Sequence, residues 1–176
     1  MAGSLLVGTT LAGCLGGTPE SAPDAVALSG SLQCDVCGMI IEKHPGPNGQ
    51  IFYADERPEG HDNPARFDSL KQCLFPYKLE HERLGWNAAA VYVTDYSSID
   101  YDLQTEGGTT YISSHTAPGS FGVAKDLRYV VESDVQGAMG PDFIPFSERG
   151  DAEALTSTYG GTVVEYGEIG EGLIGR

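Results

Sequence analysis

Basic residues are scarce in this 176-residue chain. It has 10 Lys and Arg residues against 25 Asp and Glu residues, which gives a formal net charge of -15 at pH 7. A charge of this sign and size repels the phosphate backbone of DNA and RNA, so the composition excludes nucleic acid as a partner. The acidic residues occur along the whole chain, and we expect them to form a solvated acidic surface.

Long apolar runs are missing as well. The apolar stretch at 5–12 is far shorter than the roughly 20 residues that a membrane-spanning helix needs. It ends in Leu11-Ala12-Gly13-Cys14, which resembles the bacterial lipobox, although no Lys or Arg precedes it as in an ordinary signal peptide. We therefore expect a lipoprotein-type signal peptide at 1–13 and lipid attachment at Cys14. The protein would be extracytoplasmic and anchored to the membrane surface without crossing it.

Residues 14–31 contain Gly, Pro, Ser and Ala in a composition typical of a flexible linker. We expect this segment to be a tether between the lipid anchor and the folded part of the chain.

The first half of the folded part mixes short strands with one helix. A turn rich in Pro and Gly at 45–49 predicts a hairpin between 33–41 and 51–54. Apolar residues at helical spacing predict a helix at 67–84, which Pro76 should kink or interrupt. The run of Ala and Val at 88–93 is typical of a buried strand.

The second half repeats this order of elements. The expected elements are strands at 110–113 and 127–132, a helix at 148–159 and a last strand at 162–166. The sequence thus predicts an α+β fold of two β-β-α-β modules packed together. Their expected limits are 32–96 and 97–169, followed by a tail at 170–176.

Cysteine is rare, and two of the four cysteines lie in Cys34-Asp35-Val36-Cys37-Gly38-Met39. Thiolate and thioether sulfur are soft ligands that select Cu(I) over hard cations. Haem attachment would need His directly after the second cysteine, where Gly38 stands. Structural zinc would need two further ligands, and Cys73 with a histidine could supply them.

Two further alternatives stay open for this motif. A thiol-disulfide oxidoreductase would use the Cys-x-x-Cys pair in an oxidising compartment, but the residues after Gly38 favour a strand over the helix that lowers thiol pKa values in such enzymes. An assembly factor without metal would carry a structural disulfide between Cys34 and Cys37. That disulfide would leave Met39 without a role, whereas a thioether is a copper ligand at any pH.

Several motifs together resemble the nitrous-oxide-reductase accessory lipoprotein family, NosL, over about 32–169. They are Cys34-x-x-Cys37-Gly38-Met39, Pro45-Gly46-Pro47-x-Gly49-Gln50, Val93-x-Asp95, Gly137-Ala138-Met139-Gly140-Pro141 followed by Phe143 and Phe146, and Tyr159-Gly160-Gly161. The resemblance implies a Cu(I)-binding metallochaperone, not an enzyme, that delivers copper to the apoprotein of nitrous oxide reductase for its copper-sulfide centre. It also implies a fold similar to organomercurial lyase.

The resemblance implies Cys34, Cys37, Met39 and Met139 as the copper ligands, and other copper carriers as further partners. Histidines add two weaker candidates, because neutral imidazole also binds copper. These are His44, close to the cysteine motif, and His115, at a predicted strand end in the module of Met139.

The remaining histidines and Cys73 are expected to lie outside the site. We expect His61 and His81 to face solvent, and His115 as well unless it is a ligand. Cys73 lies on the apolar face of the expected helix, where a buried, inert thiol is the simpler interpretation.

Overall fold

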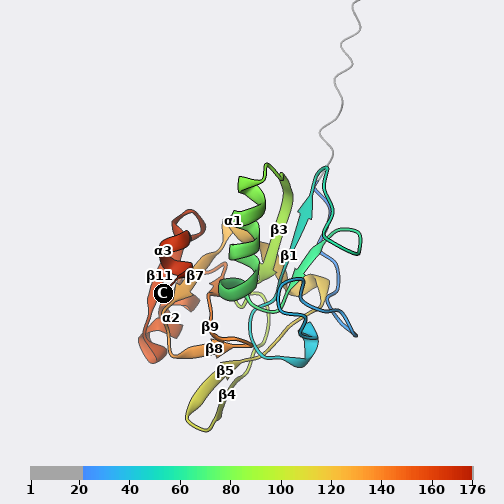
Figure 1. The fold of residues 1–176 in the computed structure, drawn as a ribbon. Coiled ribbons are helices and arrows are strands. Elements are labelled where there is room, and N and C mark those ends of the chain that lie inside the picture. The colour runs from blue at the N-terminus through green and yellow to red at the C-terminus, as the bar shows by residue number, and fades with distance from the viewer. Residues whose placement is uncertain (1–21, 176) are drawn as a thin grey trace, which may run out of the picture.

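Residues 22–175 are described by a computed structural model of the protein, and their first sheet has four strands in the order β2-β1-β3-β6 (Figure 1). Every neighbouring pair in this sheet is antiparallel. All five residues of β1 are buried, so this strand lies in the interior of the fold. The strands are β1 (Gly49–Tyr53), β2 (Ala65–Phe67), β3 (Ala88–Thr94) and β6 (Phe121–Val123).

The helix expected at 67–84 is present but begins later, because 65–67 pair with β1 as strand β2. The chain forms a π-helical turn, η2 (Leu70–Leu74), and continues as α1 (Phe75–Arg83). Pro76 is the second residue of α1, so the change from π to α geometry lies just before the proline that was expected to interrupt the helix.

Gly49 in β1 allows η2 to pack closely against the sheet. A Cβ atom at this position would lie 2.2 Å from Leu74 Cδ1 and 3.1 Å from Leu70 Cδ2. Any larger residue would therefore push η2 away from β1.

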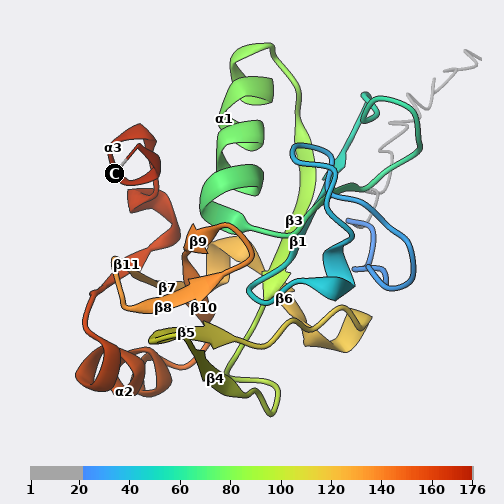
Figure 2. The same ribbon diagram turned by 60° about the horizontal axis from the view of Figure 1, so that its bottom comes forward.

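The second sheet has the strand order β10-β7-β11 and is also antiparallel. As in β2-β1-β3, the first strand in sequence lies in the centre and a helix connects the second strand to the third. Figure 2 shows α1 beside the first sheet and α2 beside the second. The elements of this unit are β7 (Arg128–Val131), β10 (Ile144–Phe146), α2 (Arg149–Tyr159) and β11 (Thr162–Glu165).

The α+β class predicted from the sequence is therefore confirmed, and the β-β-α-β order occurs twice. The limits expected for the modules, 32–96 and 97–169, stay a prediction. Within the second unit, the strand at 110–113 was assigned wrongly, because it belongs to a third sheet, and 144–146 takes its place.

The third sheet has the order β4-β5-β8-β9, with β5 and β8 parallel. Its first two strands form a hairpin that extends away from the rest of the molecule (Figure 1). Its last two strands form a tight hairpin with Ala138 and Met139 in the turn. The strands are β4 (Leu103–Glu106), β5 (Thr109–Ile112), β8 (Val135–Gly137) and β9 (Gly140–Pro141).

Short helices occupy several of the connections and the C-terminal segment. They are η1 (Ile41–Lys43), η3 (Pro118–Ser120), η4 (Ala124–Asp126), η5 (Tyr166–Glu168) and α3 (Glu171–Ile174), the last within the segment expected to be a tail.

The larger hydrophobic core joins the two halves of the chain. The ring of Phe75, from α1, lies 5.7 Å from that of Tyr129 and 5.8 Å from that of Phe143, both from the second half. A smaller core, with Ile144 and Leu155 among its residues, lies under α2. The two units are therefore packed together through a shared interior, as the sequence predicted.

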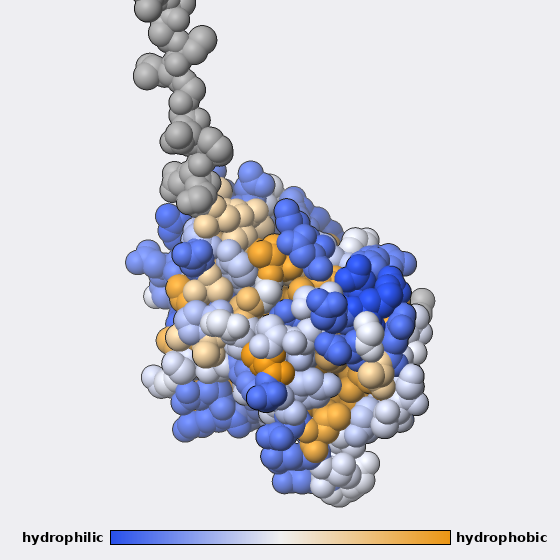
Figure 3. Space-filling view, turned by 180° about the vertical axis from the view of Figure 1, so that it is seen from behind, coloured by the Kyte–Doolittle hydropathy of each residue, from blue (hydrophilic) through white to orange (hydrophobic). Residues whose placement is uncertain are grey.

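On the face seen in Figure 3, hydrophilic residues predominate and apolar patches are small, in keeping with the acidic composition.

The hairpin expected between 33–41 and 51–54 does not form. Gln33 and Ile40 instead form an isolated bridge, which closes 34–39 into a tight turn of its own. Strand β1 pairs with β2 and β3.

Residues 22–31, the described part of the expected tether, are attached to the domain. Val26 and Gln50 exchange two hydrogen bonds, at 3.0 Å and 2.9 Å. Leu28 is completely buried.

The expected signal peptide and Cys14 lie outside the described residues. Within 22–175, no helix has the length and apolar character needed to span a membrane.

Candidate metal centre

The Cys-x-x-Cys turn is held against strand β2 by its second residue, Asp35. The Asp35 N–H donates to the carbonyl of Arg66 at 2.9 Å, and its Oδ2 accepts from the Arg66 N–H at 2.7 Å. Its Oδ1 lies 2.8 Å from His61 Nε2. The turn is closed by the Cys34 N–H, which donates to the carbonyl of Met39 at 2.9 Å. These bonds fix Cys34 and Cys37 at the end of β2.

The segment that follows β2 brings two more side chains to the same place. Asp68 comes directly after the strand and Cys73 lies in η2. One ligand atom each from Cys34, Cys37, Asp68 and Cys73 lie within 4.8 Å of one another. We call these four residues the thiol cluster.

Hydrogen bonds within the thiol cluster run toward the carboxylate. The Cys37 thiol lies 3.3 Å from both Asp68 oxygens, and the Cys73 thiol lies 3.6 Å from Asp68 Oδ1. All three cysteines are free thiols. Three sulfur donors and one oxygen donor are thus available to a single ion.

Met139 reaches the thiol cluster from the second half of the chain. It lies in the turn between β8 and β9, and its Sδ is 3.6 Å from Cys73 Sγ. The side chain is 42% exposed, whereas Cys34 and Cys73 are buried. Met139 is therefore partly open to solvent, whereas Cys34 and Cys73 are not.

The three thiols differ in proton affinity. The hydrogen bond from the Cys73 thiol lowers the pKa of Cys34, and the same bond, together with burial, raises the pKa of Cys73. Burial raises the pKa of Cys37 to about 12. Of the three thiols, Cys34 therefore loses its proton most readily, and Cys37 and Cys73 hold theirs more tightly.

The other ligand candidates from the sequence do not join the thiol cluster. Met39 is half-buried, and no hydrogen bond links its sulfur to a cluster thiol among the described residues. His44 lines a separate hollow with Glu42 and Tyr111. His115 Nε2 lies 2.9 Å from Ser113 Oγ, and burial lowers the pKa of this imidazole.

Sequence reasoning missed Asp68 and undervalued Cys73. The thiol of Cys73 is buried as expected, but it is in contact with Asp68 and Met139 rather than isolated among apolar groups. An acidic residue shortly before a helix is common, so nothing in the sequence pattern marked Asp68 as a residue of the site. The histidines expected to face solvent, His115 included, are half-buried instead. His61 pairs with Asp35, and His81 stacks on Tyr77 with ring centroids 3.8 Å apart.

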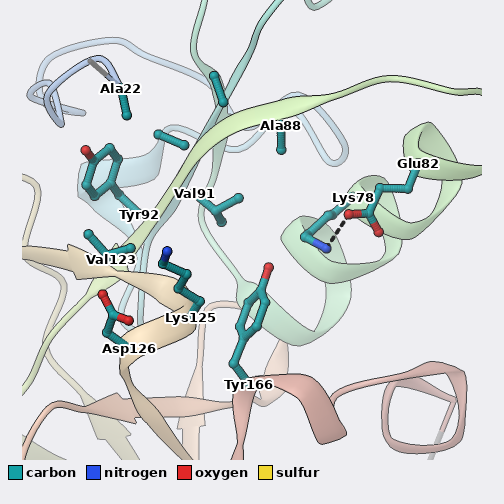
Figure 4. Close-up of a pocket in the computed structure, with 12 residues that line it drawn as sticks. Ala22, Lys78, Glu82, Ala88, Val91, Tyr92, Val123, Lys125, Asp126 and Tyr166 are labelled. Carbon is teal, nitrogen blue, oxygen red and sulfur yellow. Dashed lines mark hydrogen bonds and ion pairs between the residues drawn. The ribbon is translucent and has the colours of Figure 1, made fainter. Parts of the chain in front are cut away.

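A groove of about 550 Å³ between α1 and β3 is separate from the thiol cluster (Figure 4). Lys78 and Glu82 form an ion pair at 2.6 Å on its α1 side, and Tyr166 extends into it. Its lining contains no Cys, Met, His or Ser residue. The groove therefore offers no soft ligand set for copper.

Comparisons with known proteins point to one family. The NosL family model matches residues 25–174. The copper-binding lipoprotein NosL of Stutzerimonas stutzeri is 30% identical over 151 residues, which cover 86% of this chain and 68% of that protein. The copper-binding lipoprotein NosL of Achromobacter cycloclastes is 29% identical over 139 residues, which cover 78% of this chain and 63% of that protein.

A solved structure agrees with these matches. The crystal structure of the copper chaperone NosL from Shewanella denitrificans superposes with a TM-score of 0.66 at 27% identity, and the match covers 88% of this chain and 99% of that one. Because the family model matches most of the chain, this protein belongs to the NosL family.

Proposed function

We propose that this protein is a Cu(I)-binding metallochaperone, a carrier and not an enzyme. The observation that carries the proposal is the convergence of three free thiols and a thioether at one place in the fold. Sulfur donors of this kind favour Cu(I) over Mg²⁺ and Ca²⁺, which prefer oxygen. The names of the relatives, copper-binding lipoprotein and copper chaperone, support the same ion.

The ligands that the geometry supports best are Cys34, Cys37, Cys73 and Met139. Met39, His44 and His115 remain candidates on sequence grounds alone. Relative to the set expected from the sequence, the proposal thus adds Cys73, whose sulfur lies between Asp68 and Met139.

Asp68 has a different part in the proposal. Its carboxylate accepts a hydrogen bond from the Cys37 thiol, and the Cys73 sulfur lies 3.6 Å from Asp68 Oδ1. When an ion displaces those protons, the carboxylate is left beside the bound cation. A hard oxygen is a poor ligand for Cu(I), so Asp68 would orient the thiols before the ion arrives and need not bind it.

The proposal extends to the recipient and the location. We propose that the copper is delivered to the apoprotein of nitrous oxide reductase for its copper-sulfide centre, with exchange to other copper carriers. The protein would act outside the cytoplasm, held to the membrane by lipid on Cys14. Support comes from the lipobox motif and from the description of both curated relatives as lipoproteins.

The deciding experiment is Cu(I) titration of the reduced protein against a Cu(I) chelator, followed by X-ray absorption of the loaded protein. We expect one ion per chain with sulfur neighbours in the majority and negligible binding of Mg²⁺. Tight four-coordinate Zn²⁺ binding with no competition from Cu(I) would instead indicate a structural zinc site of three Cys and one Asp. If the protein binds no metal and its cysteines exchange disulfides rapidly with a substrate, a thiol-disulfide oxidoreductase would be the better description.

A further inference from the structure

Asp142 is a buried carboxylate with an unusual set of partners. It is 2% exposed, and its Oδ1 accepts hydrogen bonds from three backbone N–H groups. These are the N–H groups of Leu70 at 3.1 Å, Lys71 at 2.8 Å and Phe143 at 2.8 Å. Burying a carboxylate costs free energy unless such donors compensate it, and here they compensate Oδ1, whereas Oδ2 is buried without a hydrogen-bond partner among the described residues.

The bonds of Asp142 join two segments that both carry residues of the proposed metal site. Leu70 and Lys71 lie in η2, between Asp68 and Cys73. Asp142 itself lies three residues after Met139 and directly after strand β9. One carboxylate oxygen therefore ties the thiol-bearing segment to the thioether-bearing hairpin across about 70 residues of chain.

The hairpin of Met139 has little freedom once its base is fixed. Strands β8 and β9 pair Gln136 with Pro141 and Gly137 with Gly140, which leaves Ala138 and Met139 as the turn. A further bond joins the same base to η2, from Gln72 Nε2 to the carbonyl of Pro141 at 3.3 Å. Movement of residue 142 would thus be transmitted to Met139 Sδ.

We propose that Asp142 is a positioning residue of the metal site: it does not touch the ion, and it holds the Met139 thioether beside the Cys73 thiol. The inference rests on the proposed metal-binding function. Asp142 would affect Cu(I) affinity only because it positions Met139. A purely structural role would lower stability without this dependence.

The test is a double-mutant cycle on reduced protein at neutral pH, with Cu(I) affinity as the readout. Asp142→Ser shortens the side chain so that it no longer reaches η2, and Asp142→Asn keeps the size and one acceptor oxygen. We expect losses of about tenfold and about threefold, respectively, in the parent, and almost none in a Met139→Leu background.

A matched control is Asp95→Ser. Asp95 is also buried, and its Oδ1 accepts from the N–H groups of Ser97 at 3.0 Å and Ser147 at 2.9 Å, but it ties together segments without cluster residues. This variant should lose stability and keep the parent's Cu(I) affinity.

Several results would overturn the proposal. Equal losses from Asp142→Ser in both backgrounds would show that Asp142 does not act through Met139. If Asp142→Ser does not fold, Asp142→Asn decides alone, and an affinity equal to the parent's would refute the positioning role. A parent protein that binds no Cu(I) would refute the proposed function itself. This failure is seen in the parent alone, whereas a failure of the positioning role is seen only when the variants are compared with it.

Discussion

The three cysteines of the thiol cluster are chemically unequal before any ion arrives. Cys34 receives a hydrogen bond that lowers its pKa, while Cys37 and Cys73 keep their protons because they are buried and lie close to Asp68. Cys34 is therefore the cysteine that ionises most readily, and binding of a cation would displace the protons of the other two. A site of this kind avoids three adjacent negative charges in its empty state.

The first prediction concerns the two methionines. Met139→Leu removes the thioether and keeps the volume, so the free energy of unfolding should change by less than about 1.5 kcal/mol. Cu(I) affinity should fall by about tenfold, because a sulfur ligand is lost. Met39→Leu is the companion variant, measured by the same chelator competition. Unchanged affinity in both variants would mean that no thioether binds the ion, and a site of Cys with His44 or His115 would then be the better description.

The second prediction concerns the pH dependence of stability. Burial raises the pKa of Asp142 to about 6, whereas an unfolded Asp has a pKa of about 3.9. The folded protein thus binds this proton more tightly than the unfolded chain does. The stability that this group contributes is fully present below about pH 4 and is lost as the pH rises through about 6, a change of roughly 3 kcal/mol.

Urea unfolding of the metal-free protein at several pH values, compared with Asp142→Asn, checks this sign. As the pH rises from about 4 to about 7, the parent should lose stability relative to Asp142→Asn, because Asn does not titrate. A difference that stays constant over this range would show that Asp142 has an ordinary pKa in the folded protein.

At the scale of elements, the longer segments could be predicted from the sequence and the three-residue strands could not. The strand at 88–93 and the helix at 148–159 have clear apolar patterns and appear nearly where expected, as β3 and α2. β2 and β10 are too short to show a pattern, and β10 contains a proline in its centre. Both are strands only because a longer neighbour, β1 or β7, supplies the hydrogen bonds.

The same distinction applies to the site. Cys34 and Cys37 could be identified because their spacing is local. Asp68 and Cys73 join them only when β2 and η2 are folded next to the Cys-x-x-Cys turn, and no local spacing encodes that arrangement. Met139 was found through a family motif, not through any pattern that places it near Cys73.

The third prediction concerns the contact between the Met139 hairpin and the turn before β1. Gly46 has φ of +113°, and a Cβ there would lie 2.6 Å from Gly137 Cα. Gly46→Ala should therefore destabilise the fold by more than backbone strain alone, on the order of 2 to 4 kcal/mol, and should also weaken Cu(I) binding by displacing the hairpin. Gly60→Ala is the control, since Gly60 also has positive φ but no atom within 4 Å of the added carbon.

Thermal unfolding and Cu(I) affinity of both glycine variants check this prediction. The Gly60 variant should lose only about 1 to 2 kcal/mol and bind Cu(I) as the parent does. If the two variants have the same stability and the same Cu(I) affinity, the hairpin can move away from residue 46 without loss of stability or of Cu(I) binding.

At the scale of the whole molecule, charge and anchoring act together. The net charge of -15 keeps the protein away from anionic lipid headgroups, so an attachment to the membrane cannot depend on surface electrostatics. The chain from residue 22 onward is held against the domain by Val26 and Leu28. Any tether between a lipid anchor and the domain therefore ends before these contacts.

The fourth prediction is that the mature protein begins at lipid-modified Cys14. Mass spectrometry of the N-terminal peptide from the membrane fraction should show a diacylglyceryl cysteine, and Cys14→Ala should release the protein from that fraction. The Cys14→Ala protein, once purified, should still bind Cu(I), because the thiol cluster does not include this cysteine. Unmodified Cys14 in a longer soluble chain would refute the anchor without affecting the proposed copper site.

The exposure of Met139 bears on how fast cargo could leave the protein. Met139 is 42% exposed, while Cys34 and Cys73 are buried and Cys37 is half-buried. A sulfur atom of an acceptor protein could therefore replace the thioether first, while the thiolates still hold the ion. Transfer would then proceed by associative ligand exchange, with a rate that rises with acceptor concentration and needs no prior unfolding of the carrier. Copper would never be released as a free ion between the two proteins.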